Sequence, residues 1–277
     1  MVPAMATMVE QTRAVDTTPA HEAPAERLTS VDLLRGVVMV VMALDHTRDF
    51  LGDLVTNPTD LSRASTALFL TRWITHFCAP TFFLLAGTGA RLSLARRGRD
   101  GVSRFLLTRG LWLVVLELTV LRWAWQFNLD YRVTVLNVIW ALGWSMVALS
   151  LLVRLPDRAV AIIAVLMIAL HNGLDGLAPE RFGALAPLWN VLHRPGLLPS
   201  PAGTTIFLAY PLVPWIGVMA AGWALGAVYE WSPDRRRRWL LTAGACLVWG
   251  FVLLYPMCRW FAAFKARRRD RWWVGYL

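Results

Sequence analysis

Long apolar runs recur along this chain and constrain its fold more than any other feature. A helix needs about 20 mostly apolar residues to cross a bilayer. Seven segments approach this requirement, near residues 32–51, 68–90, 105–127, 134–153, 159–178, 204–229 and 239–262. Composition agrees, because 57% of the residues are hydrophobic and 17% are charged, against about 45–50% and about 25% in soluble domains. The sequence therefore predicts an all-α, polytopic integral membrane bundle of about seven spans.

Basic residues gather in the short connections between these runs and predict the topology. The chain has 28 Lys and Arg against 18 Asp and Glu, a net charge of +10. Such an excess can bind nucleic acid, but clusters in short loops are typical of the cytoplasmic face of a membrane protein. We therefore expect no nucleic-acid partner. The clusters at 91–104, 154–158 and 235–238 predict a cytoplasmic N-terminus and place the loop 179–203 outside.

The two ends of the chain are polar. Residues 1–26 lack the apolar core of a signal peptide, and their Pro, Ala, Glu and Thr content predicts a disordered cytoplasmic tail. The multi-pass domain would occupy 27–264, followed by a basic tail at 265–277. This tail conflicts with the topology, because a seventh span would place its arginines outside the cell. Either one span is wrong, or an odd number of helices is missing before the tail.

The first apolar run carries charged residues that are costly in lipid. At 100° per residue, Arg35 and His46 would lie within about 20° of each other around a helix and about 16 Å apart along it. They belong to a stripe with 3-4-3-4-3 spacing, which consists of Asp32, Arg35, Met39, Met42, His46 and Asp49. Such a stripe favours a polar interior, where Asp45 could tune His46 as a general base. The alternative is that Arg35 snorkels to the interface and His46 only bonds a neighbouring helix.

A second pair of ionisable residues lies on the second run. Arg72 and His76 are four residues apart and share a helix face. Pro80, one turn further on, can kink the helix beside them. Arg72 could hold a phosphate or carboxylate while His76 transfers a proton. The alternative is an interfacial arginine beside a structural histidine.

Glu117 is an isolated carboxylate within the third run. A charge in this position must be paired or protonated. We expect an ion pair with Arg35, Arg72 or Arg109. The three cysteines and the remaining histidines show no metal-ligand spacing, so no metal site is expected.

Several blocks of the sequence resemble one family of membrane proteins. RLTSVDLLRG, an apolar run and DHTRDF, within residues 27–50, are similar to the first block of the heparan-α-glucosaminide N-acetyltransferase-like family. Four further blocks of this chain resemble the bacterial branch of that family, namely TRWITHFCAPTFFLLAGT, FLLTRGLWLVVLELT, VIWALG and YPLVPWIGVM. The arginine and histidine separated by ten residues also resemble the signature of the broader membrane acyltransferase superfamily.

The resemblance implies a membrane acyltransferase that moves an acetyl group from acetyl-CoA to a sugar-like acceptor across a bacterial inner membrane. The lysosomal enzyme has its active histidine in the loop after this first helix, whereas residues 51–66 contain no histidine. The catalytic role would then fall to His46, oriented by Asp45, or to His76. Substrate or CoA binding would fall to Arg35, Arg72 and Glu117.

The resemblance further implies acetyl-CoA as a co-substrate, with no tightly bound cofactor. The expected partners are the lipid bilayer, a small-molecule or glycan acceptor and, in a homo-oligomer, further copies of the chain. One alternative is a transporter or channel with a polar intramembrane path, although internal repeats and paired broken helices are not evident in the sequence. Another is an inactive, shortened relative, because residues 251–271 resemble the family's final helix yet follow the sixth run almost directly.

Overall fold

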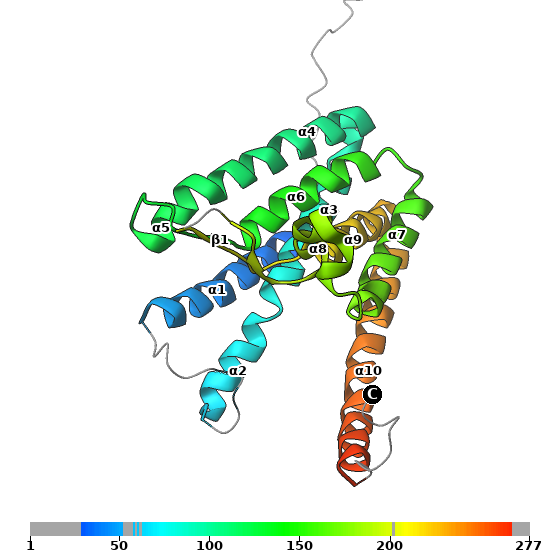
Figure 1. Ribbon diagram of the computed structural model, residues 1–277. Helices are drawn as coiled ribbons and strands as arrows, with labels where there is room; N and C mark the ends of the chain where they lie inside the picture. Colours follow the sequence, from blue (N-terminus) through cyan, green and yellow to red (C-terminus); the bar gives the residue numbers. More distant parts are fainter. Residues whose placement is uncertain (1–28, 52–57, 59, 61–62, 201–202, 268–277) are drawn as a thin grey trace, which may run out of the picture.

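Ten α-helices and one small sheet make up the computed structural model, which describes residues 29–51, 58, 60, 63–200 and 203–267 (Figure 1). The helices are α1 (Thr29–Leu51), α2 (Thr66–Thr75), α3 (Cys78–Leu92), α4 (Leu94–Leu116), α5 (Arg122–Gln126), α6 (Val138–Leu152), α7 (Asp157–Leu170), α8 (Ala186–His193), α9 (Leu212–Gly226) and α10 (Pro233–Arg267). A π-helix, η1 (Glu117–Leu121), joins α4 to α5, and 3₁₀ turns lie at His171–Leu174, Pro179–Leu185 and Ala227–Glu230. The predicted N-terminal tail and residues 268–277 of the basic tail lie outside the described residues.

Each of the seven predicted apolar runs contains a helix, and the described chain is mostly helical. Four helical segments are long and apolar enough to cross a membrane, namely Thr66–Leu92, Asp157–Leu174, Leu212–Glu230 and Pro233–Phe261. The helix Val138–Leu152 is apolar but shorter. These segments support the prediction that the chain is a membrane protein, while the number of seven spans stays a prediction.

A three-stranded sheet corrects the all-α prediction. The strands β1 (Val133–Leu136), β2 (Gly196–Leu198) and β3 (Thr205–Leu208) have the order β1-β3-β2. Two predicted helical spans were thus wrong at their starts, where β-branched residues favour extended backbone. The strands β1 and β3 are parallel, with Leu136 opposite Leu208. The residues that follow β1 and β3 therefore lie close together at the same edge of the sheet.

Glycines allow the central helices to approach closely. The helix α9 packs on α3, α6 and α7. A Cβ atom on Gly222 would stand 2.0 Å from the Leu84 carbonyl oxygen, and one on Gly87 would stand 2.0 Å from that of Met219. Because the helices are this close, the Thr88 hydroxyl can donate a 3.0 Å hydrogen bond to the Gly222 carbonyl. Small residues at such contacts are typical of membrane helix pairs.

Ion pairs join α3, α7 and the 3₁₀ turn that follows α9. The buried Arg91 lies 2.7 Å from an oxygen of Asp157 and 2.7 Å from an oxygen of Glu230. Arg99 adds a 2.9 Å contact with Asp157. The basic clusters in the first turns of α4 and α10 consequently lie at the same end of the helical body, as predicted. Their placement in the cytoplasm stays a prediction.

The helix α10 extends away from the other helices along most of its length (Figure 1). Among the described residues of its most apolar 18-residue stretch, none is buried. Its 35 residues span about 52 Å at 1.5 Å per residue. The cluster 235–238 and the start of the basic tail therefore lie at opposite ends of one helix, so the topological conflict predicted from the sequence persists in the structure.

Candidate functional site

A cavity of about 460 Å³ lies beside α1, the α2–α3 junction and the carboxyl ends of β1 and β3. Four residues singled out in the sequence line it, namely Asp45, His46, Arg72 and His76. Asp45 and His46 come from α1, Arg72 comes from α2, and His76 directly follows α2; the two helices contact each other. Their convergence brings two imidazoles, a guanidinium and a carboxylate to one space.

Pro80 explains how His76 reaches this cavity. Proline has no N–H to donate to the carbonyl four residues earlier, and its ring clashes with that carbonyl. For Pro80 that carbonyl belongs to His76, and the helix indeed breaks here, since α2 ends at Thr75 and α3 begins at Cys78. The kink predicted from the sequence is confirmed. It leaves His76 at the corner between the two helices.

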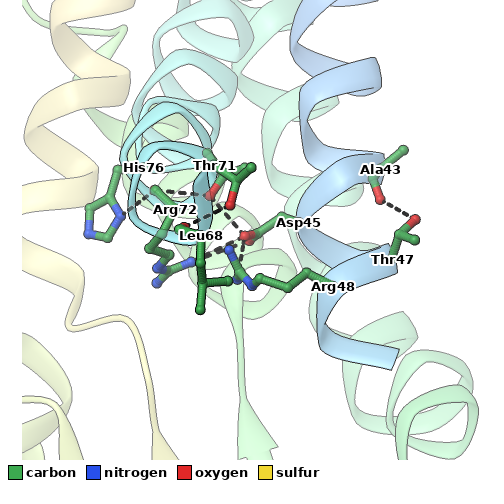
Figure 2. A network of polar contacts seen from close by, with 9 residues as sticks. Ala43, Asp45, Thr47, Arg48, Leu68, Thr71, Arg72 and His76 are labelled. Carbon is green, nitrogen blue, oxygen red and sulfur yellow. Dashed lines mark hydrogen bonds and ion pairs between the residues drawn. The ribbon is translucent and has the colours of Figure 1, made fainter. Parts of the chain in front are cut away.

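The Asp45 carboxylate is the centre of a polar network between α1 and α2, and Figure 2 shows two arginines converging on it. Arg48 on the same helix lies 2.6 Å from it. Arg72 lies 3.4 Å from each of its oxygens, and the Thr75 hydroxyl donates a 2.8 Å hydrogen bond to it. Hydrogen bonds to an ionised group are stronger than neutral ones, so the network fixes α1 against α2.

His46 is held by aromatic packing rather than by a carboxylate. Its ring makes an edge contact with Trp125, at 5.3 Å between centroids and 71° between planes. Its Nδ1 atom is buried without a hydrogen-bond partner, and no hydrogen bond joins it to Asp45 within the described structure. The side chain of Asp49, the other carboxylate of the stripe, lies outside the described residues.

The orientation of His76 indicates which of its nitrogens can accept a proton. Its Nδ1 lies 3.2 Å from the Arg72 carbonyl oxygen. A carbonyl oxygen only accepts hydrogen bonds, so Nδ1 must carry the hydrogen in this contact. In the neutral imidazole Nε2 then holds the lone pair. His76 thus has the tautomer of a general base with Nε2 as the accepting atom.

Arg35 does not share the cavity with His46, so this part of the stripe prediction is wrong. Its guanidinium lies 3.4 Å from Asp32, one turn away on α1, and both side chains are exposed. The 16 Å that separates Arg35 from His46 along a helix explains the result, because the cavity occupies only one end of α1. A role for Arg35 in holding CoA stays a prediction.

Glu117 lies behind the cavity wall. It is 4% exposed, and one of its oxygens accepts a 3.3 Å hydrogen bond from the backbone N–H of Asn137. No cation pairs with it among the described residues, so the expected ion pair is wrong. Instead, the π-helix at η1 aims the carboxylate at the start of α6, where unpaired N–H groups favour negative charge.

Sequence reasoning missed several residues of the cavity. Asn137 and Tyr210 line it because they follow the paired strands β1 and β3. Trp125 on α5 and Cys78 at the start of α3 also line it. The sequence carried a partial signal for Cys78 and Tyr210, which stand in blocks quoted for the family resemblance. Among the described residues, no group of three His, Cys, Asp or Glu side chains is arranged to hold a metal.

Comparison with known protein families gives one match. Residues 27–254 fit the model described as heparan-alpha-glucosaminide N-acetyltransferase, catalytic. No curated protein and no solved structure matches the chain. The matched segment contains every residue that lines the cavity and continues into α10.

Proposed function

The chain belongs to the family of heparan-alpha-glucosaminide N-acetyltransferase catalytic domains, and from this premise we propose that it transfers an acetyl group from acetyl-CoA to a sugar-like acceptor at a bacterial inner membrane. One observation carries the proposal. Two histidines, an arginine and an aspartate, all within the matched segment, line one cavity between α1 and α2.

In the proposed reaction His76 is the general base. Its Nε2 takes the proton from an amine or hydroxyl of the acceptor, whose nitrogen or oxygen attacks the carbonyl carbon of the acetyl thioester. The carbon–sulfur bond breaks, the sulfur takes up a proton, and the products are the acetylated acceptor and CoA. General-base assistance of this kind contributes about 10²–10⁴-fold to a rate.

His46 offers a second route to the same products. Trp125 fixes its ring, and a fixed imidazole can accept the acetyl group on a nitrogen before passing it to the acceptor. Such a carrier would suit an acetyl donor and an acceptor that approach from different faces of the membrane. Arg35, about 16 Å away along α1, would then hold the phosphates of CoA at the other end.

Incubation of the purified full-length protein with radiolabelled acetyl-CoA and glucosamine tests the proposal. We expect label in the acceptor and, on the carrier route, transiently in the protein. Absence of label from both, in protein whose thermal unfolding shows that it is folded, would overturn the proposal. Heat-denatured protein serves as the blank.

A shortened, inactive relative is the second candidate, and α10 favours it. This helix buries none of the residues in its most apolar stretch, as expected if helices that should pack on it were missing. Folded protein that binds acetyl-CoA but transfers nothing would support this candidate. Multiple turnovers in the same assay would exclude it.

A further inference from the structure

A groove of about 420 Å³ lies between α1 and α2, next to the cavity. Its walls are Leu44, Thr47, Arg48 and Leu51 from α1 with Ala67, Leu68 and Thr71 from α2. The spacing 44, 47, 48 and 51 defines one face of α1. Asp45 and His46, on a neighbouring face, line the cavity instead. The groove and the cavity are therefore separate hollows on the same pair of helices, and the contacts of Asp45 with Arg48 and Arg72 lie between them.

The groove is more apolar than its composition suggests. The Thr47 hydroxyl donates a 2.8 Å hydrogen bond to the Ala43 carbonyl, and the Thr71 hydroxyl donates one of 2.8 Å to the Leu68 carbonyl (Figure 2). Both hydroxyls are thus bonded to the backbone of their own helices. Arg48 is the charged residue of this lining.

Positive charge gathers where the groove meets the cavity. Arg48 lines the groove, Arg72 lines the cavity, and both contact the single carboxylate of Asp45. The Arg72 contact is long, at 3.4 Å, and a phosphate would provide a better partner for its guanidinium.

We propose that the acceptor is an anionic, lipid-linked molecule whose hydrocarbon chain lies in the α1–α2 groove and whose phosphate binds at Arg72 and Arg48. This inference rests on the proposed acetyl transfer and names the class of its acceptor. The sugar-like head group would enter the cavity from the bilayer side, past Asp45. His76 and His46 would then meet the acceptor at the end of the molecule remote from its lipid chain.

Photolabelling of the full-length protein in phosphatidylcholine vesicles tests the groove. The probe is phosphatidic acid with a diazirine in its acyl chain, and the matched control probe is the equivalent phosphatidylcholine. We expect the anionic probe to label 44–51 and 67–71 about tenfold more strongly, as one charge-assisted hydrogen bond would provide. Equal labelling by both probes would overturn the proposal.

Two variants of α2 locate the binding. Ala67→Trp fills the groove and should abolish the labelling, whereas Leu70→Trp places the same side chain at an exposed position that lines neither hollow. Labelling that survives Ala67→Trp would overturn the proposal. Dodecyl phosphate should compete with the probe, whereas competition by inorganic phosphate alone would show that a free anion, not a lipid, is the ligand.

A transfer assay in the same vesicles separates this inference from the proposed function. If the wild-type protein transfers acetyl groups to free glucosamine and the anionic probe labels its groove, both proposals hold. If labelling is as expected and no acetyl transfer occurs, the proposed function fails, whereas the assignment of the groove as a site for an anionic lipid holds. If transfer occurs and the groove takes no anionic probe, the inference about the acceptor fails alone.

Discussion

The Asp45 carboxylate and the Thr75 hydroxyl, 30 residues apart in the chain, meet in a 2.8 Å hydrogen bond between α1 and α2. The same carboxylate contacts the guanidinium groups of Arg48 and Arg72. One short side chain therefore joins α1, which carries His46, to α2, whose end is followed by His76. Changes at Asp45 should affect stability and activity together.

Replacement of Asp45 by Asn should destabilise the protein by about 1–3 kcal/mol, because a partly buried hydrogen-bonded charge is lost. It should also release Arg72 into the cavity and lower acetyl transfer. Thermal unfolding in detergent measures the first effect. Asp32→Asn is the control, since its exposed pair with Arg35 is expected to contribute about 0–1 kcal/mol. Equal effects of the two variants would contradict the importance given to the network.

Replacement of His76 by Ala should lower the rate of acetyl transfer about 10²–10⁴-fold, the usual contribution of a general base. His46→Ala tests the carrier route and should abolish transient labelling of the protein if that route operates. His171→Ala, at the end of α7 and outside the cavity, should leave the rate unchanged. A normal rate in His76→Ala would remove this residue from the proposed reaction.

Replacement of Trp125 by Leu should loosen the His46 ring. Trp125 also stacks on Phe50, at 4.8 Å between centroids, so the variant loses two aromatic contacts. The contact with the His46 ring contributes about 0.5–1.5 kcal/mol, and its loss predicts a decrease of about 2–10-fold in transfer rate. Steady-state kinetics should show the change, while Trp123→Leu on the same helix, whose side chain is exposed, should behave like the wild type.

Replacement of Gly222 by Ala should push α3 and α9 apart, because the new Cβ would stand 2.0 Å from a backbone oxygen of Leu84. Overpacking of this kind costs about 1–3 kcal/mol or more. Gly244→Ala introduces the same methyl group on α10, where nothing lies within 4 Å, and should be neutral or slightly stabilising. Thermal unfolding of the two variants, measured side by side, checks the difference.

The predicted topology can be tested with single cysteines in a background that keeps only the buried Cys78. A membrane-impermeant maleimide should spare Arg97→Cys and Arg237→Cys in intact cells, because both basic connections are expected in the cytoplasm. It should label Leu185→Cys, in the loop expected outside. Permeabilised cells provide the control, in which all three positions should react. Labelling of Arg97→Cys in intact cells would show that the orientation is opposite to the predicted one.

Much of the cavity could be predicted from local spacing. The apolar runs located the helices, and charges within those runs singled out Asp45, His46, Arg72 and His76, which converge in the structure. Pro80 marked the kink from sequence alone. Each of these features depends on residues within a few turns of one another, where helical geometry alone predicts which side chains share a face.

The remaining features depend on contacts that local spacing does not encode. Asn137 and Tyr210 line the same cavity because β1 pairs with β3, which is about 70 residues away in the sequence. The partner of Asp45 was also misjudged. Neighbouring residues on a helix point about 100° apart, so Asp45 reaches α2 rather than His46. Glu117 accepts a hydrogen bond from the backbone N–H of Asn137 instead of pairing with a cation, because the π-helix η1 directs its carboxylate to the start of α6.

The exposed helix α10 has a mechanical consequence. The tilt of a membrane helix is normally set by the neighbours packed against it, and otherwise by the match between its apolar length and the thickness of the hydrocarbon layer. No residue in the most apolar stretch of α10 is buried against another part of the described chain. The angle of α10 should therefore follow the bilayer, steepening in thick membranes and tilting in thin ones, while the bundle around the cavity keeps its own geometry.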